Sequence, residues 1–372
     1  MFYITFSSLW SFAVFFMMSY IIFLSSLILY ILPVQGRLTK VASTSLRTNF
    51  LYINSFDLLH VLLTPILIMV LLNVLWSSYS VSCWFGHIVY TDFHQKMFYL
   101  ITLFFIIVLL VHSSTSYYSS QEIYDFVVTN YSFYYWLFLL FTTNSIFTVI
   151  FGIEVLSTLI FLLIITSAYS SNFFYRNLDL SFGNYKQQVF PYTYLQSLLF
   201  FFWMSLVTSL TLFIFLLYFY TKLLTFDWFL IEHVFTYLVN SKSMTSLLSI
   251  GLVWFMFTVC IFVKCGIAPL YIWKPTFFKG LPLHVLFFYV CFFYFFLFLF
   301  IVYLLLNYVS VIFYYYIFIQ TIFIFSGLIF LLAMMCETFY IKSFLAVSSI
   351  LNSLFVLLAI SNPHVTDLLL WF

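Results

Sequence analysis

The chain has 372 residues, of which 66% are hydrophobic, 25% are aromatic and only 6% are charged. Water cannot solvate the surface of a soluble domain with this composition, so the chain is predicted to be a polytopic membrane protein. A net charge of +2, from 12 basic and 10 acidic residues, excludes the strongly basic surface that a nucleic-acid partner requires.

Ten membrane-spanning helices are predicted from apolar runs of about 20 residues. They cover approximately residues 8–32, 51–76, 97–115, 127–148, 150–170, 192–220, 245–268, 283–307, 310–333 and 342–360. Short polar or aromatic loops join them, and none is long enough for a domain outside the membrane. We therefore expect an all-α bundle of about ten transmembrane helices, forming a single membrane domain over residues 1–372.

Basic residues gather in the loops that follow odd-numbered spans. These loops hold Arg37, Lys40, Arg47, Arg176, Lys186, Lys274, Lys279 and Lys342. The loops after even-numbered spans hold only Lys96, Lys222 and Lys242. By the positive-inside rule, the odd loops face the compartment from which the chain is inserted, and Met1 lies on the opposite side. Met1 leads almost directly into a long apolar helix, so no cleavable signal or basic transit peptide is expected.

Few residues suggest a metal or redox centre. The five cysteines have no paired ligand spacing, and we interpret them as small apolar packing residues: Cys83, Cys260, Cys265, Cys291 and Cys336. The histidines and the aspartate of residues 77–96 have no metal-ligand spacing either. There is no G-x-G-x-x-G dinucleotide motif. We therefore expect no metal and no cofactor on this chain.

Asp57 and His60 lie three residues apart in the second span, and so on one helix face. This pair is either interfacial or part of a proton relay. A stronger candidate is Lys264, which ends an uncharged run over residues 243–263. A cation inside a span costs about 2.5–3.5 kcal/mol on insertion scales, so it usually has a function.

Two helix-breaking residues, Gly266 and Pro269, follow Lys264. A lysine beside a helix break can meet water, backbone carbonyls or a carboxylate partner inside protein instead of lipid. The alternative is a lysine near a helix end that extends its ammonium to the membrane interface. The residues by themselves leave both readings open.

The segment from Lys264 to Pro282 reads K-C-G-I-A-P-L-Y-I-W-K-P-T-F-F-K-G-L-P. It resembles the signature K-L-G-x-A-P-F-H-x-W-x-P-x-x-x-x-G-x-P of NADH dehydrogenase subunit 2, an antiporter-like membrane-arm subunit of respiratory complex I. The positions that agree are Lys264, Gly266, Ala268, Pro269, Trp273, Pro275, Gly280 and Pro282. The histidine of the family signature is Tyr271 here.

A second resemblance surrounds Glu154, the only charged residue between Asp125 and Arg176. The segment N-S-I-F-T-V-I-F-G-I-E-V-L-S-T-L resembles N-x-x-x-x-F-L-G-I-E-L-x-S-L of the same family. The resemblance implies that Glu154, on the fifth helix, pairs with Lys264 on a broken seventh helix and transfers protons with it. A purely structural buried ion pair is the alternative.

The chain departs from the family pattern between Gly280 and Cys336, where it has no Lys, Arg, Asp or Glu. The family usually carries a second lysine on the eighth helix, and the matching position here is Tyr294, a phenol that cannot hold a mobile positive charge. His284 is the nearest imidazole. It is either a substitute proton site or a histidine at a helix start.

The resemblance also divides the chain. It implies N-terminal helices 1–3 over residues 1–125, a first antiporter-like repeat with helices 4–8 over 126–307, and the start of a second, inverted repeat with helices 9–10 over 308–372. The family has fourteen helices, so we expect a separate chain to supply about four more. The other expected partners are complex I membrane-arm subunits and membrane lipids, with no nucleic acid.

The function implied is that of a proton-translocating subunit of mitochondrial NADH:ubiquinone oxidoreductase in the inner membrane, with the N-terminus on the intermembrane-space side. Such a subunit belongs to a respiratory-chain enzyme but carries no redox centre of its own. Two alternatives stay open: a non-pumping scaffold subunit of the same complex, and a free-standing cation/proton antiporter.

Overall fold

The structure is a computed structural model that describes residues 81–83, 87–115, 120–179, 192–240, 244–267, 271–281, 283–307, 317–336 and 340–360. The predicted spans at residues 8–32 and 51–76 lie outside the described residues, and Asp57 and His60 lie outside them too. Pro269, the predicted second helix breaker, is also outside this part of the chain.

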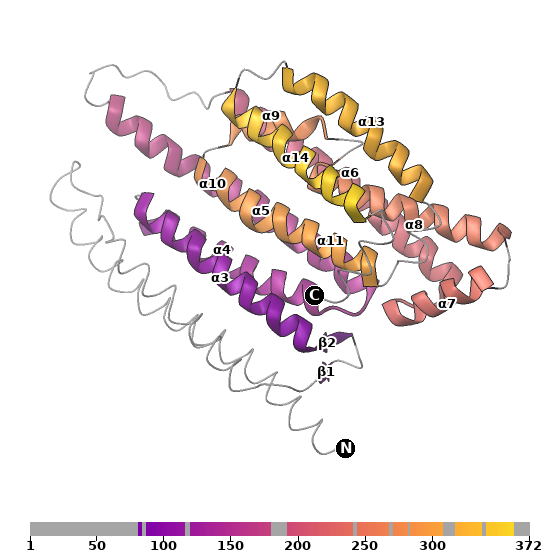
Figure 1. The fold of residues 1–372 in the computed structure, drawn as a ribbon. Helices are drawn as coiled ribbons and strands as arrows, with labels where there is room; N and C mark the ends of the chain where they lie inside the picture. Colours follow the sequence, from indigo (N-terminus) through magenta and orange to yellow (C-terminus); the bar gives the residue numbers. More distant parts are fainter. Residues whose placement is uncertain are drawn as a thin grey trace. The chain divides into compact units, whose positions relative to one another are not determined.

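Most of the described residues are helical (Figure 1). The helices are α3 (Asp92–Thr115), α4 (Ser120–Thr142), α5 (Ile146–Asp179), α6 (Tyr192–Leu223), α7 (Trp228–Asn240), α8 (Met244–Cys265), α9 (Trp273–Gly280), α10 (Leu283–Phe288), α11 (Phe295–Asn307), α13 (Ile317–Cys336) and α14 (Ile341–Ile360). A π-helix, η2 (Tyr289–Tyr294), joins α10 to α11, so these three form one continuous helical segment.

The predicted helical character is confirmed, since each predicted span from residue 97 onward overlaps a helix, although the predicted span 127–148 runs past the end of α4 at Thr142. One departure is a short hairpin of β1 (Val81–Cys83) and β2 (Ile88–Tyr90), which pair antiparallel with Val81 opposite Tyr90. Another is α7, a helix of 13 residues where we predicted no span. The predicted total of ten includes spans that lie outside the described residues, so it stays a prediction.

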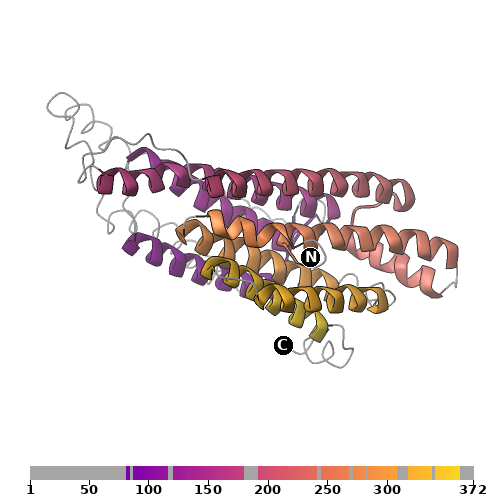
Figure 2. The ribbon, with the colours of Figure 1, turned by 90° about the horizontal axis from the view of Figure 1, so that it is seen from above.

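The chain divides into two compact units, and one of the boundaries between them, after Ser157, lies within α5. The first unit covers residues 1–143 and 158–188, and in it α3 packs on α4 and on β2. The second unit covers residues 144–157 and 189–372. In it, α6 packs against α8 and α9, and α14 packs against α9 and α13. Figures 1 and 2 show α13 and α14 lying side by side.

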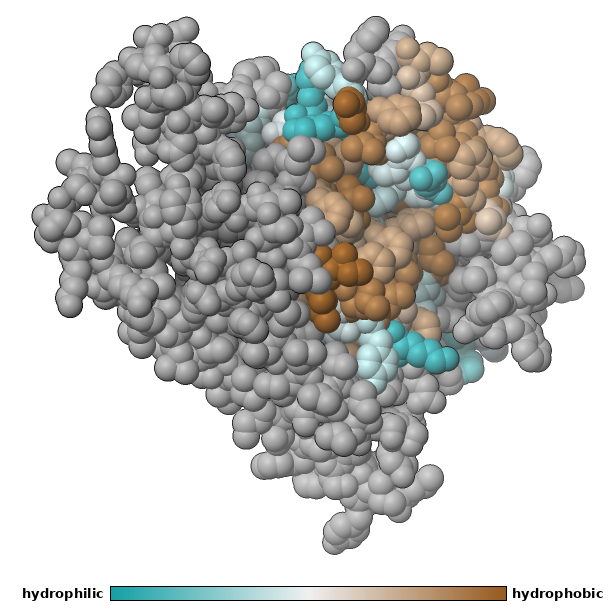
Figure 3. All heavy atoms as spheres, turned by 60° about the vertical axis from the view of Figure 1, so that its left-hand side comes forward, coloured by the Kyte–Doolittle hydropathy of each residue, from teal (hydrophilic) through white to brown (hydrophobic). Residues whose placement is uncertain are grey.

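Four stretches of the described chain are long and apolar enough to cross a membrane. They are Ile146–Ile165, Tyr194–Leu223, Val285–Leu304 and Ile341–Ala359. On α6, large apolar side chains such as Trp203, Leu210 and Ile214 are exposed, as expected for a helix that faces lipid hydrocarbon. The coloured part of the face in Figure 3 is mostly brown, with only small teal patches. These observations support a helical membrane protein.

Aromatic rings fill the core where α6, α7 and α8 meet. Phe215 of α6 stacks on Phe257 of α8 with ring centroids 4.6 Å apart, and Trp228 of α7 packs edge-on against Trp254 of α8 at 5.6 Å. Offset and edge-to-face pairs of this kind stabilise by about 0.5–1.5 kcal/mol beyond the area they bury. This packing fixes the helix that carries Lys264.

Candidate functional site

The site is built around the end of α8. Gly266 has φ +65°, a left-handed conformation that residues with a Cβ rarely adopt. Its N–H donates to the Val263 carbonyl at 3.0 Å, and the Ile267 N–H donates to the Phe262 carbonyl at 2.8 Å. These two bonds form a Schellman motif, which satisfies carbonyls that the helix end would leave unpaired. The helix therefore stops one residue after Lys264, and the next helix, α9, begins at Trp273.

The start of α9 is tied back to the end of α8 through an indole. Trp273 is buried, and its Nε1–H donates to the same Val263 carbonyl at 3.2 Å. A buried hydrogen bond of this kind contributes about 1 kcal/mol net. Two donors thus hold one carbonyl in the last turn of α8, so the two helices cannot separate without leaving polar groups unsatisfied.

Lys264 and Glu154 form an ion pair. The Lys264 Nζ donates a hydrogen bond to Glu154 Oε1, although 110 positions separate the two residues in the chain. The lysine side chain is 2% exposed and the glutamate side chain is 29% exposed. One partner is therefore almost completely out of solvent while the other stays partly open. Charge-assisted hydrogen bonds like this one contribute about 1.5–3 kcal/mol.

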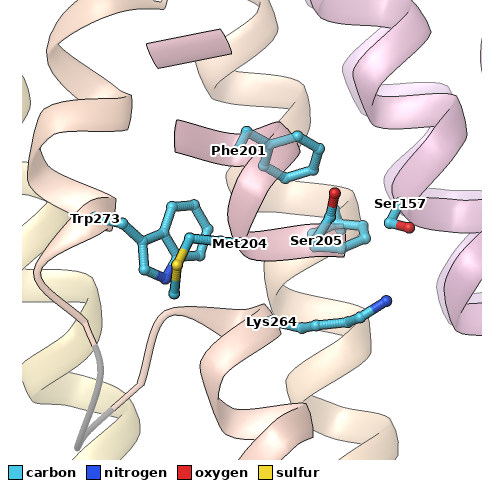
Figure 4. A pocket seen from close by; sticks show the side chains of 7 residues that line it. Ser157, Phe201, Met204, Ser205, Lys264 and Trp273 are labelled. Atoms are coloured by element: carbon cyan, nitrogen blue, oxygen red, sulfur yellow. The ribbon is translucent and has the colours of Figure 1, made fainter. Parts of the chain in front are cut away.

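A small cavity of about 10 Å³ lies beside the ion pair, with room for about one water molecule. Figure 4 shows the Lys264 side chain reaching with its nitrogen toward the helix that carries Ser157. The cavity is lined by Ser157, Phe201, Met204, Ser205, Lys264, Trp273 and Phe293. Its wall is mainly apolar, with two serine hydroxyls and one amine as polar groups.

The hydroxyls of the cavity already donate to their own helices. Ser157 Oγ donates to the Glu154 carbonyl at 2.7 Å, and Ser205 Oγ donates to the Phe202 carbonyl at 2.9 Å. Each hydroxyl oxygen keeps lone pairs for accepting a hydrogen bond. A water or an ammonium in the cavity therefore meets acceptors, which suits the passage of a proton.

Lys274 corrects the predicted distribution of loop charges. We placed it in a loop on the insertion side, but it lies in the first turn of α9 and is 0% exposed. Its Nζ has no hydrogen-bond partner among the described residues. Without Lys274, the loops after odd-numbered spans still hold more basic residues than the loops after even-numbered spans. Sequence reasoning missed this residue because a lysine directly after a tryptophan and before a proline is typical of an interface.

Tyr294 lies beneath the Lys274 ammonium. The Nζ is 3.2 Å from the centroid of the Tyr294 ring, close enough for a cation–π interaction. The Tyr294 hydroxyl donates to the Ser349 carbonyl of α14 at 2.9 Å, which fixes the ring. Tyr294 is also the last residue of η2. Single π-turns within helices are frequent at functional sites.

Lys342 joins the start of α14 to the chain after α9. Its Nζ donates to the Leu281 carbonyl at 2.6 Å, and the side chain is half-buried. We predicted Lys342 to be one of the loop charges on the insertion side. The contact also gives it a positioning role, because it holds the start of α14 against the end of α9.

The remaining candidates do not join this site in the described structure. His284 lies in the first turn of α10, but its side chain is outside the part that the structure describes. Asp57, His60 and Pro269 lie outside the described residues altogether. Within the described ranges, no three His, Cys, Asp or Glu side chains gather where they could hold a metal ion.

The chain was compared with protein-family models and with curated proteins. The chain matches no protein-family model. A search of curated proteins finds none that matches it in sequence. The function must therefore be argued from the motifs and from the site itself.

Proposed function

We propose that this chain is a proton-translocating, antiporter-like membrane-arm subunit of mitochondrial NADH:ubiquinone oxidoreductase, as its resemblance to the NADH dehydrogenase subunit 2 family implies. The observation that carries the proposal is the ion pair of Glu154 and Lys264 at the interruption between α8 and α9. The two motifs of the resemblance contain one partner each. Helix packing alone does not favour burying two charges together, because the cost of removing them from water offsets much of their attraction.

The chemistry of the proposal is proton exchange at an amine. Burial away from water disfavours an ammonium, whereas a nearby carboxylate favours it. A lysine that is 2% exposed is therefore sensitive to how close Glu154 lies. A change of one pKa unit corresponds to about 1.4 kcal/mol, so small movements of the carboxylate load or release the proton.

The driving force comes from elsewhere in the complex. In this proposal, quinone reduction on other subunits changes the charge states along the membrane arm, and the chain passes protons toward the intermembrane side. The odd-numbered loops face the matrix, as their excess of basic residues indicates. The partners are the other membrane-arm subunits and membrane lipids.

The main alternative is a scaffold subunit of the same complex that no longer transports protons. Tyr294 favours it, because the family position for a second lysine carries a phenol here. The ion pair favours transport. A free-standing cation/proton antiporter is the third reading, and it predicts that the chain works without any NADH dehydrogenase.

Two measurements separate these readings. Native membranes are solubilised in mild detergent, and the chain should migrate with NADH dehydrogenase activity; migration apart from that activity identifies the free-standing antiporter. In sealed vesicles, Lys264→Met should lower the number of protons moved per electron. The matched control is Lys279→Met, which removes an exposed lysine of α9. An unchanged ratio in Lys264→Met identifies the scaffold.

A further inference from the structure

Lys274 is a buried ionisable side chain that the proposed Glu154–Lys264 pair does not use. Its side chain is completely buried, and no described carboxylate lies within ion-pair distance of its Nζ. Its Nζ also lacks a hydrogen-bond partner among the described residues. An ionisable side chain at membrane depth is rare and usually functional, because burying it without a partner is costly.

Aromatic rings surround the amine in place of a counter-ion. The Tyr294 ring centroid lies 3.2 Å from Nζ, and the Phe278 ring centroid lies 5.8 Å away. A π face attracts an ammonium but does not bind it as tightly as a carboxylate does. The surroundings therefore accept both the protonated and the neutral form of this lysine. A group that carries a proton and releases it needs this property.

The helix end at Gly266 makes room for the Lys274 stem. A Cβ at Gly266 would lie only 2.8 Å from Lys274 Cδ. The absence of a side chain at this one position thus lets the stem of Lys274 pass against the end of α8. The feature that ends the Lys264 helix also admits the second lysine.

The two lysines belong to one neighbourhood. The stem of Lys274 packs against Gly266, which lies two residues after Lys264, and Cys265 between these two positions is fully buried. The cavity beside Lys264 is also lined by Trp273 and Phe293, the chain neighbours of Lys274 and Tyr294. Lys274 and Tyr294 are thus each one residue along the chain from a side chain that lines this cavity.

We propose that Lys274 is a second proton-binding amine on the same path, and that it exchanges a proton with Lys264 at the interruption between α8 and α9. This inference rests on the proposed function. In the step, one N–H bond of the Lys264 ammonium breaks and one N–H bond forms at the neutral Lys274 amine, and a water molecule that enters between the two amines carries the proton. No electron moves. Tyr294 occupies the family position of a second lysine and cannot carry a positive charge. In this proposal Lys274 of α9 provides that charge, with its Nζ over the Tyr294 ring.

The test compares three single variants and one double variant in sealed vesicles that hold the whole complex. Lys274→Met should lower the protons moved per electron by the same amount as Lys264→Met. The double variant should show no further fall, because both lysines serve one path. Lys279→Met is the matched control: this lysine of α9 also lies over a tyrosine ring, with its Nζ 4.1 Å from the Tyr340 centroid, but it is exposed. Its ratio should equal that of the unchanged protein.

The outcomes separate the two proposals. A fall in Lys264→Met with no fall in Lys274→Met overturns the role of Lys274 and leaves the proposed function standing. No fall in either variant overturns both. A further fall in the double variant also contradicts a shared path.

Two more variants keep the test informative where Lys274→Met disturbs assembly. Lys274→Arg retains a cation over the ring but cannot release a proton, so the complex should assemble and still show the lowered ratio. Lys274→Met combined with Tyr294→Lys returns an amine to the same place from the opposite helix, and the ratio should recover. An arginine variant with the original ratio, or no recovery in the assembled double variant, would show that Lys274 only packs.

Discussion

The two sides of the interruption between α8 and α9 hold buried lysines in different ways. Lys264, at the end of α8, meets the carboxylate of Glu154. Lys274, at the start of α9, meets the rings of Tyr294 and Phe278. A carboxylate fixes the charge of its partner strongly, whereas an aromatic face lets the charge come and go. One helix interruption can thus bury two amines, one against a carboxylate and the other against aromatic rings.

The largest effect is expected from removing the carboxylate. Glu154→Gln leaves Lys264 buried without a counter-ion, and it should lower the free energy of unfolding by about 3 kcal/mol. This is the lower end of the range for broken buried pairs, because the glutamate side chain is 29% exposed. Lys264→Met should cost less, since the carboxylate that remains can still reach water. Thermal unfolding of the purified protein in detergent, compared between the two variants, measures the difference.

A combined variant serves as the control for that prediction. Glu154→Gln together with Lys264→Met should recover much of the loss, because no charge without a partner remains at positions 154 and 264. If the loss of unfolding free energy in the double variant equals the sum of the two single losses, Glu154 and Lys264 are not energetically coupled. The contrast between Lys264 and Lys274 would then have no basis in stability.

His94 in the first unit is a third buried basic side chain, and its imidazole stays neutral near pH 7. His94 is buried in the first turn of α3, before the apolar part of that helix. Its Nδ1 accepts a hydrogen bond from the Thr91 N–H at 3.0 Å. Burial lowers the pKa of His94 from 6.5 to about 4, against a smaller opposite effect from a hydrogen bond to the Phe141 backbone.

This pKa predicts a pH dependence of stability. The unfolded chain binds a proton at His94 below about pH 6.5, and the folded protein does so only below about pH 4. The contribution of His94 is therefore complete above pH 6.5 and is lost as the pH falls toward 4, by about 2–3 kcal/mol. Between pH 6.5 and 4, the free energy of unfolding should depend less steeply on pH in His94→Asn than in the unchanged protein. The asparagine side-chain oxygen can still accept the hydrogen bond from the Thr91 N–H. An equally steep curve in that variant would assign the effect to another group.

The smallest effect is expected at Gly266. Gly266→Ala forces a Cβ into a left-handed conformation, which costs about 1–2 kcal/mol, and also presses on Lys274 Cδ. In a Lys274→Ala background the clash with Cδ should vanish, whereas the left-handed strain and the 3.2 Å approach to the Cβ of residue 274 should remain. A double-mutant cycle of unfolding free energies measures the difference. Equal losses in both backgrounds would mean that the lysine stem does not depend on this glycine.

Sequence patterns located most of the helices and one half of the site. Apolar runs of about 20 residues predicted spans that overlap helices from residue 97 onward, because a bilayer demands that length. Glu154 and Lys264 stood out as single charges in long apolar runs. The short hairpin at Val81–Tyr90 and the helix α7 escaped prediction, since three-residue strands and a 13-residue helix have no such length signal.

The place of Lys274 could not be read from the chain. A lysine in W-K-P, beside a predicted membrane surface, is indistinguishable in sequence from a solvated interface charge. Its burial depends on the φ of Gly266, on the π-turn that ends at Tyr294 and on the packing of α9 against α6 and α14. These are contacts between elements far apart in the chain, and no local pattern encodes them.

The sequence by itself determined that this is a helical membrane protein with two isolated charges and a helix-breaking glycine after one of them. The length of apolar segments and the cost of burying charge act locally, so composition and spacing are sufficient for these conclusions. Only the tertiary structure decided that Glu154 meets Lys264 and that Lys274 turns inward onto Tyr294. A charged group that is buried needs a compensating partner, because it has lost its contacts with water. Which residue becomes that partner depends on how the helices pack, and not on the local sequence.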